Sequence, residues 1–461
     1  MSARAIRSVC VIGDGIVGLC AAAAFARALP QITVTIVPAE PDAAAVAEIQ
    51  CATWPSIHRF HAAIGLDERE LIRAEIATHL LGARFGTWHE NDQAWIHGFG
   101  EHGLMAGDIP FHTLWYRAFQ AGEAAPYWHY GAAALLGAVG KFVHPSPDPA
   151  STLGGLLYAL RIDPPRYRAR LEALTAALPR HAQFASVERD ESGTVTAIAT
   201  TDGSRVTADL YLDCSGAQAL LRVPDDRAFE PWGAWLPGRS IAVSDVPNGT
   251  VHPLDHAEAF ANGWRWQSPL AERTRVIELS DTLKGAPVRF GYRTPWIGNV
   301  LAIGDAATAI DPLFGTALHL AHDAIQLALD LLPGRDFGHA EIAEYNRRSR
   351  AVATRMRNFH ALHHLHAGTM TGPLPEGLAR TLEQFRRRGR LPPFEGEPFE
   401  TDAWLAALIG LGLTPDAIDP LSASIDSARA AQAMDALASR LAHATKRVPP
   451  YPQLLTQLRE G

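Results

Sequence analysis

A glycine-rich turn near the start of the chain has the residue types and the spacing needed to hold a phosphate. Residues 13–18 read G-D-G-I-V-G. We expect Gly13 to permit a tight turn, Gly15 to let the backbone approach a pyrophosphate, and Gly18 to let a helix pack closely on a strand. The pattern predicts dinucleotide binding, because a helix that starts here directs its amides and dipole at an anion. The alternative is a glycine run that serves helix packing alone.

An acid after the second strand is the usual partner of the ribose in such a site. Residues 32–37 (ITVTIV) predict that strand, but Pro38 stands where the acid is normally found. Glu40 is the candidate ribose-binding residue, and Asp42 is the alternative.

A second part of the predicted site lies far along the chain. Gly304 and Asp305 follow an apolar strand predicted over 299–303 and precede a helix predicted over 316–332. We expect the Asp305 carboxylate to accept hydroxyls of a flavin ribityl chain, and a helix N-cap is a second, compatible role. This pairing favours FAD over NAD as the cofactor.

The elements that position these residues indicate an α/β fold. An apolar strand at 8–12 and an Ala-rich helix at 19–29 flank the glycine turn and predict a Rossmann-like, FAD-binding unit. Alternating segments over 184–208, with Ser-Gly and Asp-Gly turns, predict a small antiparallel meander. We expect an FAD-binding domain from 1–80 and 184–335, a partly interleaved substrate lobe over 81–183, and a helical C-terminal cap over 336–461.

Composition restricts the classes of partner. The chain has 461 residues and a formal charge of −8, which gives no electrostatic reason to bind nucleic acid or an anionic membrane. No continuous apolar run is long enough to span a bilayer, and no secretory signal is visible, so we expect a cytoplasmic protein. The four cysteines lack C-x-x-C spacing, and no metal site is expected from them.

Several motifs together resemble the flavin-dependent tryptophan halogenases along almost the whole chain. The W-x-W-x-x-P run is the most specific of them. The motifs are Gly13–Gly18, Ala52-Thr53-Trp54-Pro55, Asp213-Cys214-Ser215-Gly216, Gly263–Pro269, Pro295–Val300 and Gly304–Ala307 with Pro312-Leu313. The resemblance implies the fold of flavin monooxygenases and halogenases.

The resemblance also implies a two-component reaction. A separate flavin reductase supplies reduced FAD, which reacts with oxygen and a halide to give hypohalous acid. This small oxidant crosses a tunnel to an aromatic substrate, where a lysine and a glutamate assist. Trp264 and Trp266 are expected to project from one face of a strand and to separate the flavin from the substrate.

Three positions depart from the family pattern. Arg84 stands at the position of the lysine, where it can polarise an oxidant by hydrogen bonding but cannot readily form a haloamine. Phe314 replaces the glutamate. Cys51 replaces an acid in the flavin segment that ends at Thr53, either as a neutral buried thiol or as a redox-active residue.

The resemblance also implies that Gly315 and Thr316 support a halide through backbone amides. His79 is the local candidate for proton transfer, in the same chamber as Arg84, or else a half-buried strand residue.

His360 and His364 share a helix face, but no acidic third ligand is evident nearby, which favours packing over a metal site. Tryptophans within residues 85–130 line a substrate chamber or belong to the core.

The sequence predicts an FAD-dependent oxidoreductase that uses reduced flavin and oxygen on an aromatic substrate, with indole as one candidate. Halogenation is the leading named activity. A flavin monooxygenase or oxidase without halogenation is one alternative, and a flavin-binding partner protein without turnover is another.

Overall fold

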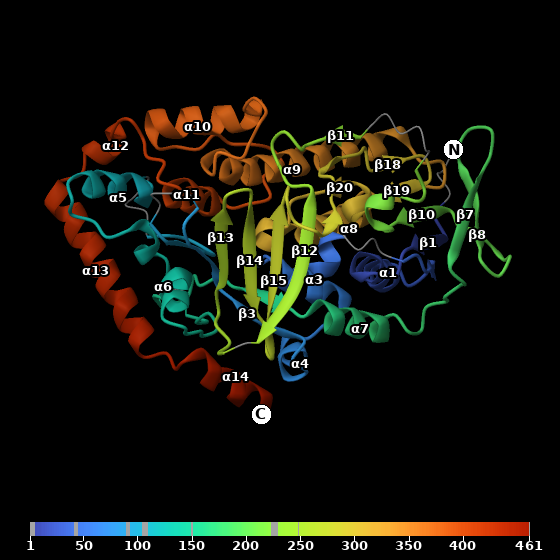
Figure 1. The fold of residues 1–461 in the computed structure, drawn as a ribbon, viewed down its shortest axis with the longest axis horizontal. Helices are drawn as coiled ribbons and strands as arrows, with labels where there is room; N and C mark the ends of the chain where they lie inside the picture. Colours follow the sequence, from blue (N-terminus) through green and yellow to red (C-terminus); the bar gives the residue numbers. More distant parts are fainter. Residues whose placement is uncertain are drawn as a thin grey trace.

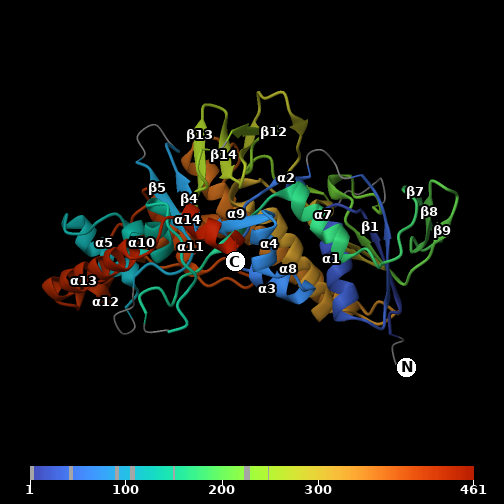
Figure 2. The same cartoon turned by 90° about the horizontal axis from the view of Figure 1, so that it is seen from below.

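The structure is a computed structural model. It describes residues 5–40, 45–88, 93–103, 109–148, 151–222, 229–247 and 249–460. It has a mixed α/β architecture in which two sheets of different size lie side by side, with helices around them (Figures 1 and 2).

The smaller of these sheets carries the glycine turn. It has the order β18 (Trp296–Ile297), β19 (Val300–Ala302), β10 (Leu210–Asp213), β1 (Ser8–Ile12) and β2 (Thr33–Val37). All pairs are parallel except β18 with β19. The strands predicted at 8–12, 32–37 and 299–303 are thus confirmed, and their short apolar runs suit a parallel sheet that is buried on both faces.

Four helices contact α1. α1 (Ile16–Ala28) contacts α3 (Ile57–Ile64), α7 (Pro164–Leu174) and α8 (Thr316–Asp330), as well as the short helix α2 (Val46–Ile49). The small side chains of α1 allow this crowding, since its residues 16–25 are all buried. The predicted meander is also confirmed, as β7 (Phe184–Arg189), β8 (Val195–Thr200) and β9 (Arg205–Val206).

The larger sheet joins distant parts of the chain. Its order is β16 (Ala286–Pro287), β12 (Ser240–Pro247), β15 (Arg273–Ser280), β14 (Gly263–Pro269), β13 (Asp255–Phe260), β4 (Gly82–Phe85) and β5 (Trp95–Gly98). Every pair is antiparallel except β4 with β13. Strands from the expected substrate lobe and from the expected FAD-binding domain therefore share one sheet, and the domain boundaries stay a prediction.

Smaller elements lie outside these two sheets. The paired strands are β3 (Ala77–Leu80) with β6 (Ala159–Ile162), and β11 (Glu230–Pro231) with β17 (Gly291–Tyr292) and β20 (Thr308–Ala309). The helices are α4 (Glu68–Arg73), α5 (Phe111–Gln120) and α6 (Ala132–Ala138), with one-turn 3₁₀ helices at Tyr127–Tyr130, Gly216–Gln218, Gly304–Ala306 and Leu313–Gly315.

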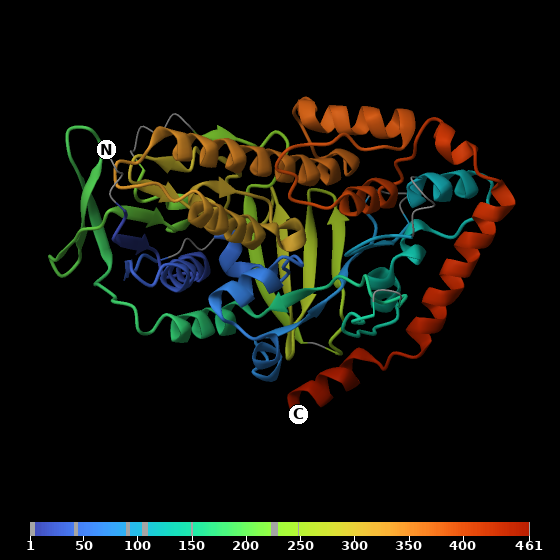
Figure 3. The same cartoon turned by 180° about the vertical axis from the view of Figure 1, so that it is seen from behind.

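The C-terminal part is helical, as predicted. It consists of α9 (His339–His366), α10 (Glu376–Arg388), α11 (Thr401–Gly410), α12 (Pro420–Ala423), α13 (Ser427–Lys446) and α14 (Tyr451–Glu460). α13 follows the end of the molecule opposite the β7–β8 meander (Figures 1 and 3). Within the described residues, no helix has the length and apolar character needed to cross a bilayer.

Candidate functional site

The glycine turn after β1 has the geometry of a nucleotide cradle. Gly13 has φ of +110°, and a Cβ on it would lie 2.6 Å from the carbonyl oxygen of Cys214. A Cβ on Gly18 would lie 2.1 Å from the carbonyl oxygen of Gly13. Because both contacts are with backbone atoms, neither position accepts a side chain. The residues present therefore fit the pyrophosphate of FAD.

Glu48 faces the same turn and was not singled out from the sequence. A Cβ on Gly15 would lie 2.3 Å from its Oε1 atom. The amides of Ile16 and Val17, at the start of α1, donate to this carboxylate, and burial raises its pKa to about 7. The side chain therefore lies where the helix start would bind a phosphate. No local sequence pattern predicts this contact, because Glu48 lies outside α1 and follows it by about 20 residues.

Asp305 is linked to the same short helix. Its Oδ2 atom accepts the amide of Val46 at 2.8 Å, and the side chain is buried. It thus caps the start of α2. Gly304 has φ of +67° and approaches Val17, whereas Glu40 is exposed at the end of β2. The alternative ribose ligand, Asp42, lies outside the described residues.

The loop before α8 joins the flavin segment to the tryptophan strand. Gly315 has φ of +69°, and a Cβ on it would lie 2.2 Å from the carbonyl oxygen of Ala52. Thr53, next in the chain, donates from Oγ1 to the carbonyl oxygen of Leu160 at 2.5 Å. Thr316 pairs through Oγ1 with Nε2 of His360 at 2.9 Å. Gly315 thus holds the loop against the flavin segment, and Thr316 holds it against α9.

Trp264 and Trp266 project from one face of β14, as predicted. They stand opposite Ala259 and Ala257 on β13, and both are buried. The Nε1 atom of Trp266 donates to Asp255 at 2.7 Å, and that of Trp264 lies 3.4 Å from Asp311. Each indole is thus oriented by a buried carboxylate.

Asp311 also contacts the histidines of α9. Its Oδ2 atom lies 2.8 Å from Nε2 of His364, and its Oδ1 atom lies 3.9 Å from Nδ1 of His360. Burial alone would raise the pKa of Asp311, but hydrogen bonds from both histidines hold it below the ordinary value. The expectation that no acid lies near these histidines is wrong, because Asp311 reaches them from a loop about 50 residues earlier.

Phe314 lies in a buried aromatic cluster instead of facing a polar site. Its ring centroid is within 6 Å of five other rings, those of Phe85 (5.2 Å), His97 (5.1 Å), Trp266 (5.7 Å), Phe359 (5.1 Å) and His363 (4.9 Å). Its backbone has φ of +64°, which is costly for a residue with a Cβ. Strain of this kind is typical of functional loops.

A cavity of about 130 Å³ adjoins this cluster. Trp54, His97, Phe99, His319 and Phe399 are among its lining residues. Burial lowers the pKa of His97 to about 4, so the ring is neutral and its Nε2–H donates to the carbonyl oxygen of Ala403. These five rings are part of the wall, and such rings can stack on a planar ligand.

Arg84 is separated from the tryptophans by the sheet. It is exposed on β4, whereas Phe85, the next residue, packs beside Trp266. Arg84 lines an open cavity of about 340 Å³ with His256 and Gln267. The structure therefore places Arg84 and the two tryptophans on opposite faces of the sheet, because alternation along the strand directs Arg84 away from Trp266.

His79 and Cys51 lie in other surroundings. His79 is fully buried on β3 and lines a different cavity from Arg84, so the expected shared chamber is absent. Cys51 is 1% exposed, and burial raises its pKa, which supports the neutral thiol.

The tryptophans expected to line a chamber contribute to the core. Trp88, Trp95 and Trp115 are buried, and Trp128 is half-buried against the same core. Trp95 stacks on Phe85, and Trp115 stacks on Phe119.

Known proteins share this architecture and these motifs. The structure is similar to BrvH, a flavin-dependent halogenase from Brevundimonas sp. BAL3, with 31% identity, a TM-score of 0.90 and coverage of 98% of this chain and 99% of that one. It is also similar to Xcc4156, a flavin-dependent halogenase from Xanthomonas campestris, with 26% identity, a TM-score of 0.90 and coverage of 99% of both chains. Tryptophan 7-halogenase RebH from Lentzea aerocolonigenes is 23% identical, over 92% of this chain and 93% of that one.

A family model described as tryptophan halogenase matches residues 8–276 and 277–427. The match covers most of the chain and includes both the glycine turn and the tryptophan strand. The protein therefore belongs to the tryptophan halogenase family and is an FAD-dependent enzyme.

Proposed function

We propose that this enzyme halogenates a small, electron-rich aromatic substrate, with reduced FAD supplied by a separate reductase. The main support is the loop at Asp311–Thr316. It touches the flavin segment through Gly315 and Ala52, and the tryptophan strand through Asp311 and Trp264. One loop thus connects a flavin cradle to an aromatic cavity.

The same loop is suited to a halide. Phe314 and Gly315 are both left-handed, with φ of 64° and 69°, and α8 begins at the next residue. A left-handed residue followed by a right-handed one, here Gly315 and Thr316, directs successive amides into one concavity, and the glycine adds no side chain to fill it. The Gly315 amide donates to the carbonyl oxygen of Pro312, so the backbone amides of Thr316 and Ala317 are our first candidate halide ligands.

The cofactor residues are proposed on the same basis. Gly13, Gly15 and Gly18 form the phosphate cradle, and Gly304 with Asp305 faces α1 and α2 from the opposite side. Glu40 is proposed for the ribose, and Thr53 as a support of the flavin segment. When bound, reduced FAD supplies the electrons that activate oxygen toward halide. The residues of the protein bind the flavin, orient it and exclude water from it.

Trp264 and Trp266 are proposed to separate the flavin from the substrate. Both indoles are buried, and their N–H groups are held by Asp311 and Asp255. Fixed indoles exclude a substrate ring from the flavin side while leaving small species free to pass. This role requires an immobile wall, which the two carboxylates provide.

The substrate is proposed to bind in the cavity lined by Trp54, His97, Phe99 and Phe399. Aromatic walls stack a planar ring at favourable energy. Position 314 is a phenylalanine, and Arg84 lines a different cavity. The acidic residue that lines the proposed substrate cavity is Glu400.

His319 is our candidate for the proton acceptor. Substitution on an aromatic ring releases one proton, and His319 lines the cavity. Its Nδ1 atom lies 2.8 Å from Oγ of Ser56, and its Nε2 atom lies 3.6 Å from Asp323. A histidine oriented by a hydroxyl and a carboxylate is a suitable general base.

The deciding experiment combines the purified enzyme with FAD, NADH, a flavin reductase and either chloride or bromide. We expect a panel of indoles and phenols to yield products whose mass follows the halide. Products that gain one oxygen regardless of halide would indicate a monooxygenase. The absence of any product, with FAD bound, would indicate a binding protein.

His319→Gln tests the proposed base separately. We expect a loss of turnover of about 100-fold or more, with FAD affinity unchanged. The exposed residue His443 provides the matched variant His443→Gln, which should keep wild-type turnover. Full turnover in His319→Gln would disprove the base and leave the halogenase proposal standing.

A further inference from the structure

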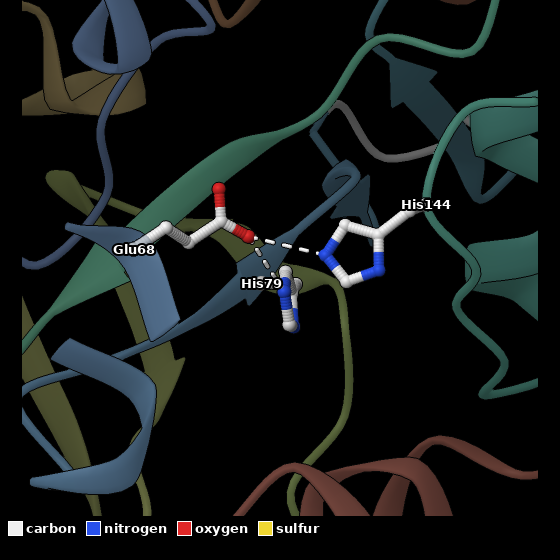
Figure 4. A group of neighbouring side chains, drawn as sticks. All are labelled: Glu68, His79 and His144. Carbon is white, nitrogen blue, oxygen red and sulfur yellow. Dashed lines mark hydrogen bonds and ion pairs between the residues drawn. The ribbon is translucent and has the colours of Figure 1, made fainter. Parts of the chain in front are cut away.

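A group of metal-binding side chains lies outside the proposed flavin and substrate sites. Glu68 begins α4, His79 lies in β3, and His144 lies in the segment that follows α6. One potential ligand atom from each lies within 4.8 Å of the other two. Figure 4 shows both imidazoles turned toward the same carboxylate oxygen.

The distances suit a small cation. The Oε1 atom of Glu68 lies 3.1 Å from Nε2 of His79 and 3.2 Å from Nε2 of His144. Ligands about 2.0–2.2 Å from a tetrahedral Zn²⁺ ion are about 3.3 Å apart from one another. The three atoms can therefore surround such an ion with small movements.

The donor types also suit this metal. Zn²⁺ accepts imidazole nitrogen and carboxylate oxygen, and two histidines with one glutamate are a known zinc ligand set.

Neighbouring groups hold two of the ligands in place. The hydroxyl of Tyr158 donates to Oε2 of Glu68 at 2.9 Å, and Nδ1 of His58 lies 3.3 Å from the same oxygen. On the other side of His79, Nδ1 lies 3.1 Å from the hydroxyl oxygen of Tyr451. Such outer partners orient metal ligands and fix which imidazole nitrogen is available.

The group is open to solvent on one side. Glu68, His79, His144 and Tyr158 line a cavity of about 520 Å³. The cavity gives a cation an entry path and leaves room for a water ligand. Three protein ligands with an open fourth position form a common zinc coordination pattern.

We propose that Glu68, His79 and His144 bind one Zn²⁺ ion, with water as the fourth ligand. The ion would join α4, β3 and the segment after α6. It would also link them to α14, because Tyr451 contacts His79. The ligands are far apart in the sequence, so no spacing motif reveals them.

The test uses the untagged, full-length protein after removal of metals with a chelator. We expect calorimetric titration with Zn²⁺ to give one site per chain, and Co²⁺ to give the visible absorption of a tetrahedral complex. Bound Zn²⁺ should also raise the melting temperature. Absence of binding at micromolar free Zn²⁺ would refute the site.

Two ligand variants and one control locate the site. His144 is partly exposed, so His144→Ala should fold, and Glu68→Gln removes the carboxylate with little change in shape. We expect each to weaken Zn²⁺ binding by about 100-fold or more. His443→Ala removes an exposed histidine elsewhere and should bind like the wild type. Unchanged affinity in both ligand variants would show that zinc binds adventitiously. FAD content, measured in parallel, tests the flavin site independently.

Discussion

We expect the charge of Glu48 to influence flavin binding. Its carboxylate lies at the start of α1, where the FAD pyrophosphate is proposed to bind, and two like-charged groups compete for the same amides. We expect Glu48→Gln to bind FAD roughly tenfold more tightly at pH 8, which corresponds to ~1.4 kcal/mol. Flavin fluorescence titration measures this. Glu383→Gln, at an exposed position of α10, is the control, and equal affinities in all three proteins would contradict the prediction.

Glu48 also predicts how stability depends on pH in the flavin-free protein. Its pKa is raised from 4.5 to about 7, so between these values the folded state retains a proton that the unfolded chain has lost. Stability therefore falls as the pH rises through this window, by up to about 3 kcal/mol from this group. We expect Glu48→Gln to lack that part of the slope in urea unfolding at pH 5 and pH 8. A slope identical to the wild type would show that the carboxylate is not perturbed.

At the scale of single residues, the sequence predicted which residue types the site needs better than it predicted what surrounds each of them. Gly13 and Gly18 are required by backbone contacts, as the spacing predicted. The neighbours Phe85 and Trp88 set the register predicted for Arg84, but the face that a strand residue occupies depends on tertiary packing. The contact of Asp311 with His364 was missed because it is formed between elements distant in the sequence.

Among the elements, a buried ion pair joins β6 to the large sheet. Nε of Arg161 lies 2.6 Å from Oδ1 of Asp255, both side chains are fully buried, and Asp255 also accepts from Trp266. Asp255→Ala leaves the guanidinium without its partner, so we expect a loss of about 3–5 kcal/mol in the free energy of unfolding. Urea denaturation provides the measurement.

Asp245 offers the matched control for that prediction. It pairs with Arg273 and Arg275 on β15 but is partly exposed. Asp245→Ala should cost no more than about 1 kcal/mol, since exposed pairs are screened by water. Equal losses in the two variants would show that burial does not set the strength of the Arg161 pair.

Elements with strong local patterns were predictable. The β1–α1–β2 unit, the β7–β9 meander and helix α8 follow from apolar periodicity and turn residues. The parallel pairing of β4 with β13 was not predictable, because a short apolar strand does not specify its partner. That pairing is also why one sheet crosses the expected domain boundary.

For the molecule as a whole, FAD should act as a stabilising ligand. A ligand present at 100 times its Kd stabilises the folded state by about 2.7 kcal/mol. We expect excess FAD to raise the melting temperature of the wild type but not of Gly18→Ala, whose Cβ would clash with the Gly13 carbonyl. Gly233→Ala is the control, because a Cβ there meets nothing within 4 Å. A shift of equal size in Gly18→Ala would place FAD elsewhere.

The pairing of β4 with β13 has a consequence for synthesis on the ribosome. Ala83 on β4 pairs with Asp255 on β13, which is synthesised about 170 residues later. Strand β4 therefore has no parallel neighbour until that part of the chain has been made. Until then the nascent chain displays an unpaired apolar edge, which attracts other chains or a chaperone. Ribosome-bound chains that end before residue 255 should be cut by protease near β4, whereas chains that extend well beyond residue 280 should resist.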